Sequence, residues 1–191
     1  MTEARLIRPE EYRVMPWRNG QGTTAEIATE PGEAGRFRWR LSIADVGASG
    51  PFSDFAGYDR VIAVASGAGM RLAIAGRPPV ELPQDSEPYA FPGEAATECT
   101  LLQGPIRDFN LMTDRATACG RVTALRFRGE RVTAGLSGGI VFLYATHGAA
   151  EVEGYGTVPE GATLRIDAAQ GALAIRGGTG GYALLAEIML T

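Results

Sequence analysis

Hydrophobic residues recur at every second position over most of this chain, in short runs that glycine and proline interrupt. In the run RFRWRLSIADV (36–46), Phe37, Trp39, Leu41 and Ile43 share one face of an extended strand. Similar runs follow one another to the end of the chain, among them DRVIAVAS, GMRLAIAG, GIVFLYAT and YALLAEIML. The sequence therefore predicts an all-β fold of many short strands, in which only PEEY near the N-terminus is expected to form a helical turn.

An internal repeat indicates how these strands are organised. The segment VASGAGMRLAIAG (64–76) overlays YATHGAAEVEGYG (144–156) without gaps at an offset of 80 residues. In each copy a strand, a turn of small residues and a second strand precede a proline-containing connector. We expect two similar β-units, residues 1–115 and 116–191, packed as one globular body.

The charge composition excludes several classes of partner and of chemistry. The net charge of −4 gives no basis for binding nucleic acid or an anionic membrane. All 18 basic residues are Arg, so a Schiff base, a phosphate-loop lysine and a lysine base are excluded. The N-terminus does not resemble a signal peptide, and no apolar run is long enough to span a membrane. We expect a soluble cytoplasmic protein.

Potential metal ligands are scarce. His147 is the one histidine, and the two cysteines, Cys99 and Cys119, form no CxxC motif. The sequence thus lacks a zinc signature and a disulfide framework, and it predicts neither a metal nor a cofactor. His147 is expected to be an exposed turn residue, and Cys99 a small core residue.

The stretch MPWRNGQGTT (15–24) combines side chains that a simple turn does not require. It is not a phosphate loop, because it lacks lysine and no helix follows it. One interpretation is a hairpin turn with Trp17 packed in the core, since NG and QG are turn dipeptides. The other is one wall of a small-molecule site, in which the aromatic ring, amide and hydroxyl groups contact a polar ligand. Residue types alone do not favour either of these two interpretations.

Two later strands carry polar residues opposite their apolar face. Arg40 and Ser42 alternate with the large apolar residues of the first strand, and Asp108 and Asn110 do so in DFNLM. These side chains face either bulk water or the interior of a barrel. In a barrel Arg40 would need a partner, for which Asp108 or a ligand carboxylate is available.

GYDRV places an acid beside a base. Asp59 and Arg60 would ordinarily form an exposed ion pair of little energetic value. A buried Arg60 would instead be suited to hold a carboxylate with two parallel hydrogen bonds.

Taken in order, these motifs resemble the HutD/Ves family of bicupins, small bacterial proteins associated with histidine utilisation. The resemblance runs through MPWRNGQGTTAEIA, FRWRLSIADVGASGPFSDFAGYDR, PYAFPG and CTLLQGPIRDFNLMTDR, within residues 15–115. The second half matches mainly by strand pattern and length. The resemblance implies two packed cupin-like double-stranded β-helix barrels with little helix.

The resemblance also implies a set of site residues. Gly20 and Phe52 fall on recurring family positions, and Gln21 stands where the family loop commonly has a third glycine. Metal cupins carry several histidines, but SDFAGYDRVIAVASGAG has none, which disfavours metal-dependent chemistry. The implied ligand-binding residues are Trp17, Asn19, Thr23, Thr24, Arg40, Ser42, Arg60, Asp108 and Asn110.

The resemblance, with this chemistry, predicts a metal-free small-molecule-binding protein linked to histidine utilisation. Its expected partner is a small anionic metabolite such as formiminoglutamate or formylglutamate. The alternative is a metal-independent hydrolase or isomerase, with Asp108 or Glu26 as general base and Arg40 as oxyanion partner. A third hypothesis is a structural partner of another enzyme. The sequence leaves open whether the protein is a homodimer.

Overall fold

The computed structural model describes residues 3–17 and 20–191. The chain divides into two compact units, Arg13–Cys119 and the combination of Met1–Tyr12 with Gly120–Thr191. Strands dominate both, so the all-β prediction is confirmed. Among the described residues no helix is long and apolar enough to cross a membrane. The helical segments in the described part are two 3-10 turns, η1 (Pro9–Glu11) and η2 (Glu33–Gly35).

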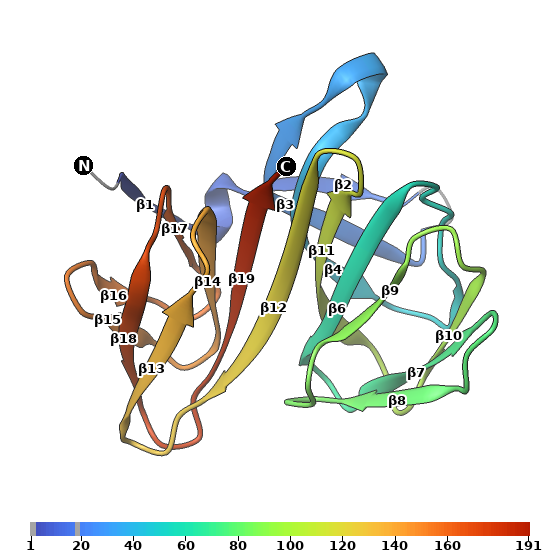
Figure 1. Cartoon of the computed structure of the whole chain (residues 1–191). Helices are drawn as coiled ribbons and strands as arrows, with labels where there is room; N and C mark the ends of the chain where they lie inside the picture. Colours follow the sequence, from blue (N-terminus) through green and yellow to red (C-terminus); the bar gives the residue numbers. More distant parts are fainter. Residues whose placement is uncertain (1–2, 18–19) are drawn as a thin grey trace. The chain divides into compact units, whose positions relative to one another are not determined.

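The Arg13–Cys119 unit consists of two antiparallel sheets (Figure 1). The larger sheet contains, in spatial order, β2 (Arg13–Pro16), β3 (Gly22–Pro31), β4 (Phe37–Val46), β11 (Ile106–Asp114), β6 (Tyr58–Ser66) and β9 (Tyr89–Pro92). The smaller sheet contains β5 (Gly50–Pro51), β10 (Thr97–Leu101), β7 (Gly69–Ile74) and β8 (Val80–Pro83).

These two sheets face each other across one apolar core. Val46 and Ile62 from the larger sheet pack in the same cluster as Met70, Leu72 and Cys99 from the smaller one. All five are buried, and removing apolar surface from water contributes about 25 cal/mol per Å². The alternating apolar residues of each strand are therefore the ones that hold the sheets together.

The other unit also has two antiparallel sheets and an apolar core that includes Val141, Leu143 and Ile175. One sheet contains β1 (Ala4–Ile7), β17 (Thr163–Ile166), β14 (Ile140–His147), β19 (Tyr182–Leu190) and β12 (Ala118–Arg126). The second contains β13 (Arg131–Leu136), β18 (Gly171–Gly177), β15 (Ala150–Val152) and β16 (Gly156–Val158).

The two units share one strand order. The order β4-β11-β6-β9 in one corresponds to β12-β19-β14-β17 in the other, and β5-β10-β7-β8 corresponds to β13-β18-β15-β16. The sequence repeat falls on β6 and β7 in one unit and on β14 and β15 in the other, which are equivalent places. Two double-sheet units of matching order constitute the bicupin fold that the sequence predicts.

The first strand differs from the division expected from sequence. β1, which lies in the segment assigned to the first unit, pairs with β17, with Ala4 opposite Ile166. The Tyr12 hydroxyl donates to the Gly161 carbonyl at 2.8 Å and lies 2.8 Å from the Thr163 hydroxyl. Edge pairing between residues so far apart leaves no local signal, so periodicity could not assign β1 to this sheet.

Candidate functional site

The Arg13–Cys119 unit contains a cavity of about 490 Å³. Strands β4, β6 and β11 line it from the larger sheet, and Cys99 on β10 lines it from the smaller one. The segment before β3 and the loop between β4 and β6 complete the lining. Ala44, Val46 and Cys99 belong both to this lining and to the apolar core, so the cavity adjoins the barrel interior.

Strand alternation and register bring the polar side chains together. Arg40 and Ser42 line the cavity, whereas Leu41 between them and Trp39 before them are buried on the opposite face. Asn110 pairs directly with Ser42, and Asp108 lies two residues along on the same face of β11. These four polar residues therefore face the interior of the unit and not bulk water.

Arg60 is the most deeply buried cation of the cavity, with 6% of its surface exposed. Its guanidinium carbon lies 4.9, 5.7 and 5.1 Å from the ring centroids of Phe52, Phe55 and Phe91. Cation–π attraction of this kind offsets part of the cost of burying the charge. The neighbouring Asp59 does not pair with it, but accepts a hydrogen bond from Arg115 at 2.7 Å.

Arg40 is half-buried beside it and shares one aromatic neighbour. Its guanidinium carbon lies 4.9 Å from the Phe37 ring centroid and 5.3 Å from that of Phe55. Its Nη2 lies 3.3 Å from the Met112 sulfur, which is a weak acceptor. Within the described residues Arg40 forms no ion pair, so Asp108, one of the two partners considered from sequence, does not pair with it, and the ligand carboxylate stays a prediction.

Four buried polar atoms on this wall have no hydrogen-bond partner among the described residues. They are Nε of Arg40, Nε of Arg60, Oδ1 of Asp108 and Oδ1 of Asn110. An unsatisfied buried polar group costs about 1–3 kcal/mol, and more where it is charged. Their concentration in one cavity sets this wall apart from an ordinary protein interior, where buried polar atoms are paired.

Burial changes the protonation equilibria of the two oppositely charged groups. Desolvation raises the pKa of Asp108 to about 7, although the charge of Arg60 acts in the opposite direction. Desolvation lowers the pKa of Arg60 to about 10, against the attraction of Asp108. Desolvation thus outweighs the mutual attraction for both groups. Near neutral pH Arg60 is charged and Asp108 is close to its midpoint.

The segment that precedes β3 forms the opposite part of the lining. Trp17 donates from Nε1 to the Thr24 hydroxyl at 2.8 Å, and both residues line the cavity. Gln21 lines it as well, so the departure from the usual family glycine falls directly on the cavity. The segment thus forms a turn and also lines the cavity, and its contact with a ligand stays a prediction.

Gly22 leaves room for the Trp17 ring because it has no side chain, which leads to a prediction. A Cβ at Gly22 would meet the backbone carbonyl of Asp45 and approach the Trp17 ring to 2.9 Å. We expect Gly22→Ala to destabilise the fold by about 1–3 kcal/mol and to shift the Trp17 environment. Urea denaturation and tryptophan fluorescence measure both effects. Gly135→Ala is the control, since nothing lies within 4 Å of the added atom, and an equal effect would contradict the prediction.

One predicted residue, Thr23, is not among the described residues that line the cavity. Thr23 donates to Asp45 Oδ2 at 3.3 Å in an exposed contact. Because successive residues of a strand point to opposite faces, Thr23 cannot accompany Thr24 into the cavity. Asn19 lies outside the described residues.

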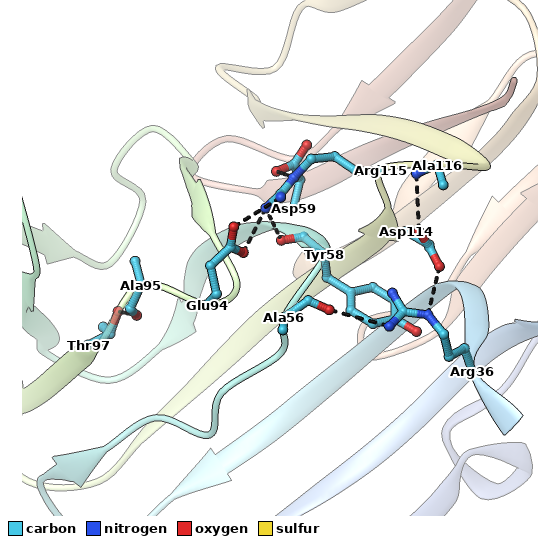
Figure 2. A network of polar contacts seen from close by, with 10 residues as sticks. All are labelled: Arg36, Ala56, Tyr58, Asp59, Glu94, Ala95, Thr97, Asp114, Arg115 and Ala116. Carbon is cyan, nitrogen blue, oxygen red and sulfur yellow. Dashed lines mark hydrogen bonds and ion pairs between the residues drawn. The ribbon is translucent and has the colours of Figure 1, made fainter. Parts of the chain in front are cut away.

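Phe55 was not predicted from sequence, although it contacts both arginines. The loop that carries it is tied to its surroundings by backbone hydrogen bonds, including Phe55 N–H to the Gly93 carbonyl at 3.0 Å. Arg36 donates to the Ala56 carbonyl at 3.4 Å and to Asp114 at 3.0 Å (Figure 2). The loop has no periodicity, so the sequence pattern gave no sign that Phe55 lies at the site. Two phenylalanines within four residues are unusual for a loop, and this composition could have drawn attention to it.

A second arginine braces the start of β6, directly after this loop. Arg115 donates to Asp59 at 2.7 Å, to both oxygens of Glu94 at 3.0 and 2.7 Å, and to the Tyr58 carbonyl at 2.9 Å (Figure 2). These contacts are partly exposed, and each adds little stability. Together they fix the chain that carries Arg60.

The Gly120–Thr191 part of the other unit differs in its described residues, where the buried carboxylate of Glu187 accepts a hydrogen bond from Arg121 at 2.6 Å. Its core cluster is aliphatic and aromatic throughout. A hollow of about 600 Å³ lies on that unit, but its charged lining is exposed and includes the Arg131–Glu153 ion pair at 2.8 Å. His147 is exposed and lies 3.8 Å from Glu160, and Cys99 is buried, as expected.

The cavity does not fit a metal ion. Within residues 3–17 and 20–191, no three His, Cys, Asp or Glu side chains are grouped closely enough to hold one. The cavity instead presents two guanidinium groups, which repel cations.

Comparison with known proteins identifies the family. The HutD family model matches residues 9–183. The chain belongs to the HutD/Ves family. An uncharacterised 21.2 kDa protein in the hutC 3′ region of Pseudomonas putida is 51% identical over 114 residues, which is 59% of each chain. The Ves protein of Citrobacter koseri is 37% identical over 139 residues, or 70% of each.

Solved structures agree with this HutD/Ves assignment. HutD from Pseudomonas fluorescens SBW25 superposes with a TM-score of 0.84 at 34% identity, covering 99% of this chain and 100% of that one. A conserved protein of unknown function from Pseudomonas aeruginosa PAO1 gives 0.83 at 36% identity, with 97% and 98% covered. YhhW from Escherichia coli, at 10% identity and a TM-score of 0.66 over 97% of each chain, shares the fold alone.

Proposed function

We propose that this HutD/Ves protein binds a small anionic metabolite, without a metal, in the cavity of the Arg13–Cys119 unit. The observation that carries the proposal is the pair of guanidinium groups of half-buried Arg40 and buried Arg60, whose buried Nε atoms lack partners among the described residues. Guanidinium groups bind carboxylates through planar, charge-assisted hydrogen bonds. A bound anion would supply those bonds and balance the buried charge.

The proposed ligand class is an acylated glutamate, such as formylglutamate or formiminoglutamate. Its carboxylates suit the two guanidinium groups, and its acyl nitrogen group suits Ser42 and Asn110. A cavity of about 490 Å³ is within the usual range for small-molecule sites. The Pseudomonas putida relative is named for its place in the hutC 3′ region, which supports a role in histidine utilisation.

Calorimetric titration of the full chain with N-formyl-L-glutamate tests the proposal. We expect one ligand per chain, because the core of the other unit is apolar. Binding to the folded state alone should add about 2.7 kcal/mol of stability at a hundredfold excess over Kd. The absence of binding and of thermal stabilisation at millimolar concentrations of either acylated glutamate would contradict the proposal.

Arg40 provides the first mutational prediction for this site. Arg40→Ala is expected to weaken binding about ten- to hundredfold, as for the loss of a hydrogen bond to a charged group. Arg40→Lys should restore little, because an ammonium cannot make the planar two-bond contact. Titration of the three proteins measures this, and equal affinities would exclude Arg40 from the binding site.

The pKa of Asp108 supports a second candidate function. A carboxyl group with a pKa of about 7 is suited to general acid–base catalysis near neutral pH. The second candidate is therefore a metal-independent hydrolase or isomerase acting on the same ligand class, with Asp108 as base and Arg40 beside the developing oxyanion. For this function, Asp108→Asn must abolish turnover and leave binding intact.

A further inference from the structure

The charges that face the cavity allow an inference that rests on the proposed function. Arg40 projects from β4 and Arg60 from β6, both opposite Met112 of β11, and Asp108 lies four residues from Met112 on the same face of β11. Cys99 faces Asp108 from β10, and burial raises the pKa of its thiol to about 11, so it is neutral at physiological pH. The cavity therefore holds two cations and one carboxyl group that is free to be charged or neutral.

Two other carboxylates act on these charges from outside the cavity, one on Arg40 and one on Asp108. Glu26 on β3 is partly exposed and acts on Arg40. Asp45 on β4 has an exposed side chain in an ion pair with Arg107 at 2.9 Å, and it acts on Asp108 across the sheet. Solvent and their partners screen both, so neither balances the charge inside.

The charge of the ligand then determines the protonation state of Asp108. A ligand with two carboxylates balances Arg40 and Arg60 completely, and an ionised Asp108 would remain as a third, uncompensated anion in a buried site. Like charges at close range strongly favour protonation of one of them. A ligand with one carboxylate leaves one guanidinium for Asp108 to balance, so that Asp108 stays ionised.

We propose that Asp108 is a specificity-determining residue that takes up one proton when a dicarboxylate binds and then donates a hydrogen bond to it. The neutral acid is an O–H donor, whereas the carboxylate only accepts. Asp108 is 3% exposed and its Oδ1 has no partner among the described residues, so its acid proton would be donated to an oxygen of a ligand bound in the cavity. The site thereby distinguishes dicarboxylates from monocarboxylates of the same shape.

Isothermal titration at several pH values tests this inference. Titrations with N-formyl-L-glutamate at pH 8, in buffers of different ionisation enthalpy, should show uptake of about one proton per ligand. Affinity should be nearly constant below about pH 7 and fall about tenfold per pH unit above it. N-formyl-L-glutamine, with an amide in place of one carboxylate, should bind without proton uptake.

Two variants locate the proton. Asp108→Asn keeps a donor of the same shape and should bind with no proton uptake and no pH dependence over the same range. Asp45→Asn should behave as wild type. Proton uptake that persists in Asp108→Asn, or wild-type binding without proton uptake, would overturn the inference and leave the proposed function standing. No binding by wild type at any pH would instead overturn the proposed function. Should Asp108→Asn not fold, the wild-type titrations with the two ligands decide alone.

Discussion

Arg60→Ala is expected to weaken binding of an acylated glutamate by about 2–5 kcal/mol, or roughly thirtyfold to several thousandfold. The reason is the depth at which this guanidinium lies. Only 6% of Arg60 is exposed. In the described part of the chain its charge is attracted by Asp108 and by the faces of three phenylalanine rings. A ligand carboxylate would thus meet a poorly solvated cation, where charge–charge attraction is strongest.

Matched variants separate the charge of Arg60 from its packing. Arg60→Met keeps an unbranched chain against Phe52 and Phe91, so it should lose the same affinity and less stability. Arg60→Lys should recover little, for the geometric reason that applies to Arg40. Arg71, exposed on β7 of the same unit, supplies the control Arg71→Ala, which should bind as wild type. Titration shows the affinities, and unchanged affinity in Arg60→Met would exclude Arg60 from ligand binding.

Arg60 also shows how far sequence could define the site. DRVIAVAS predicts a strand correctly, but the sequence favoured an exposed ion pair with Asp59 over a buried clamp for Arg60. Pairing of β6 with β11 decides between them, because Arg60 lies opposite Met112 in the cavity-facing row while Asp59 turns outward to Arg115. Such register depends on the whole sheet and is not encoded in one strand.

The same limit applies to the remaining site residues. Alternation on β4 and β11 identified Arg40, Ser42, Asp108 and Asn110 as one set, since residues two apart share a face. That rule, applied to adjacent Thr23 and Thr24, would also have removed Thr23. Loop residues follow no such period. The place of Phe55 depends on hydrogen bonds to distant segments, which sequence alone does not reveal.

In the absence of ligand, burial of Asp108 should make wild-type stability fall as pH rises from 5 to 8. The pKa of an unfolded Asp is about 3.9, whereas burial raises that of folded Asp108 to about 7. Between these values the folded state binds a proton that the unfolded state has released, so the free energy of unfolding falls with increasing pH. This contribution is complete below about pH 4 and is lost as pH passes through 7, with a total of up to about 4 kcal/mol.

Asp108→Asn removes this dependence, because an amide of the same shape cannot ionise. Urea denaturation at pH 5, 6, 7 and 8 should show the difference in stability between the variant and wild type growing steadily in favour of the variant as pH rises. Asp114→Asn is the opposite case: the Ala116 N–H, followed by Arg36, lowers the pKa of Asp114, which therefore stays ionised throughout this range. Asp114→Asn should have a lower free energy of unfolding than wild type, by the same amount at each of these pH values. If the difference between Asp108→Asn and wild type were equally constant from pH 5 to pH 8, Asp108 would not titrate in the folded protein, because only a group that changes charge between those limits can alter the slope.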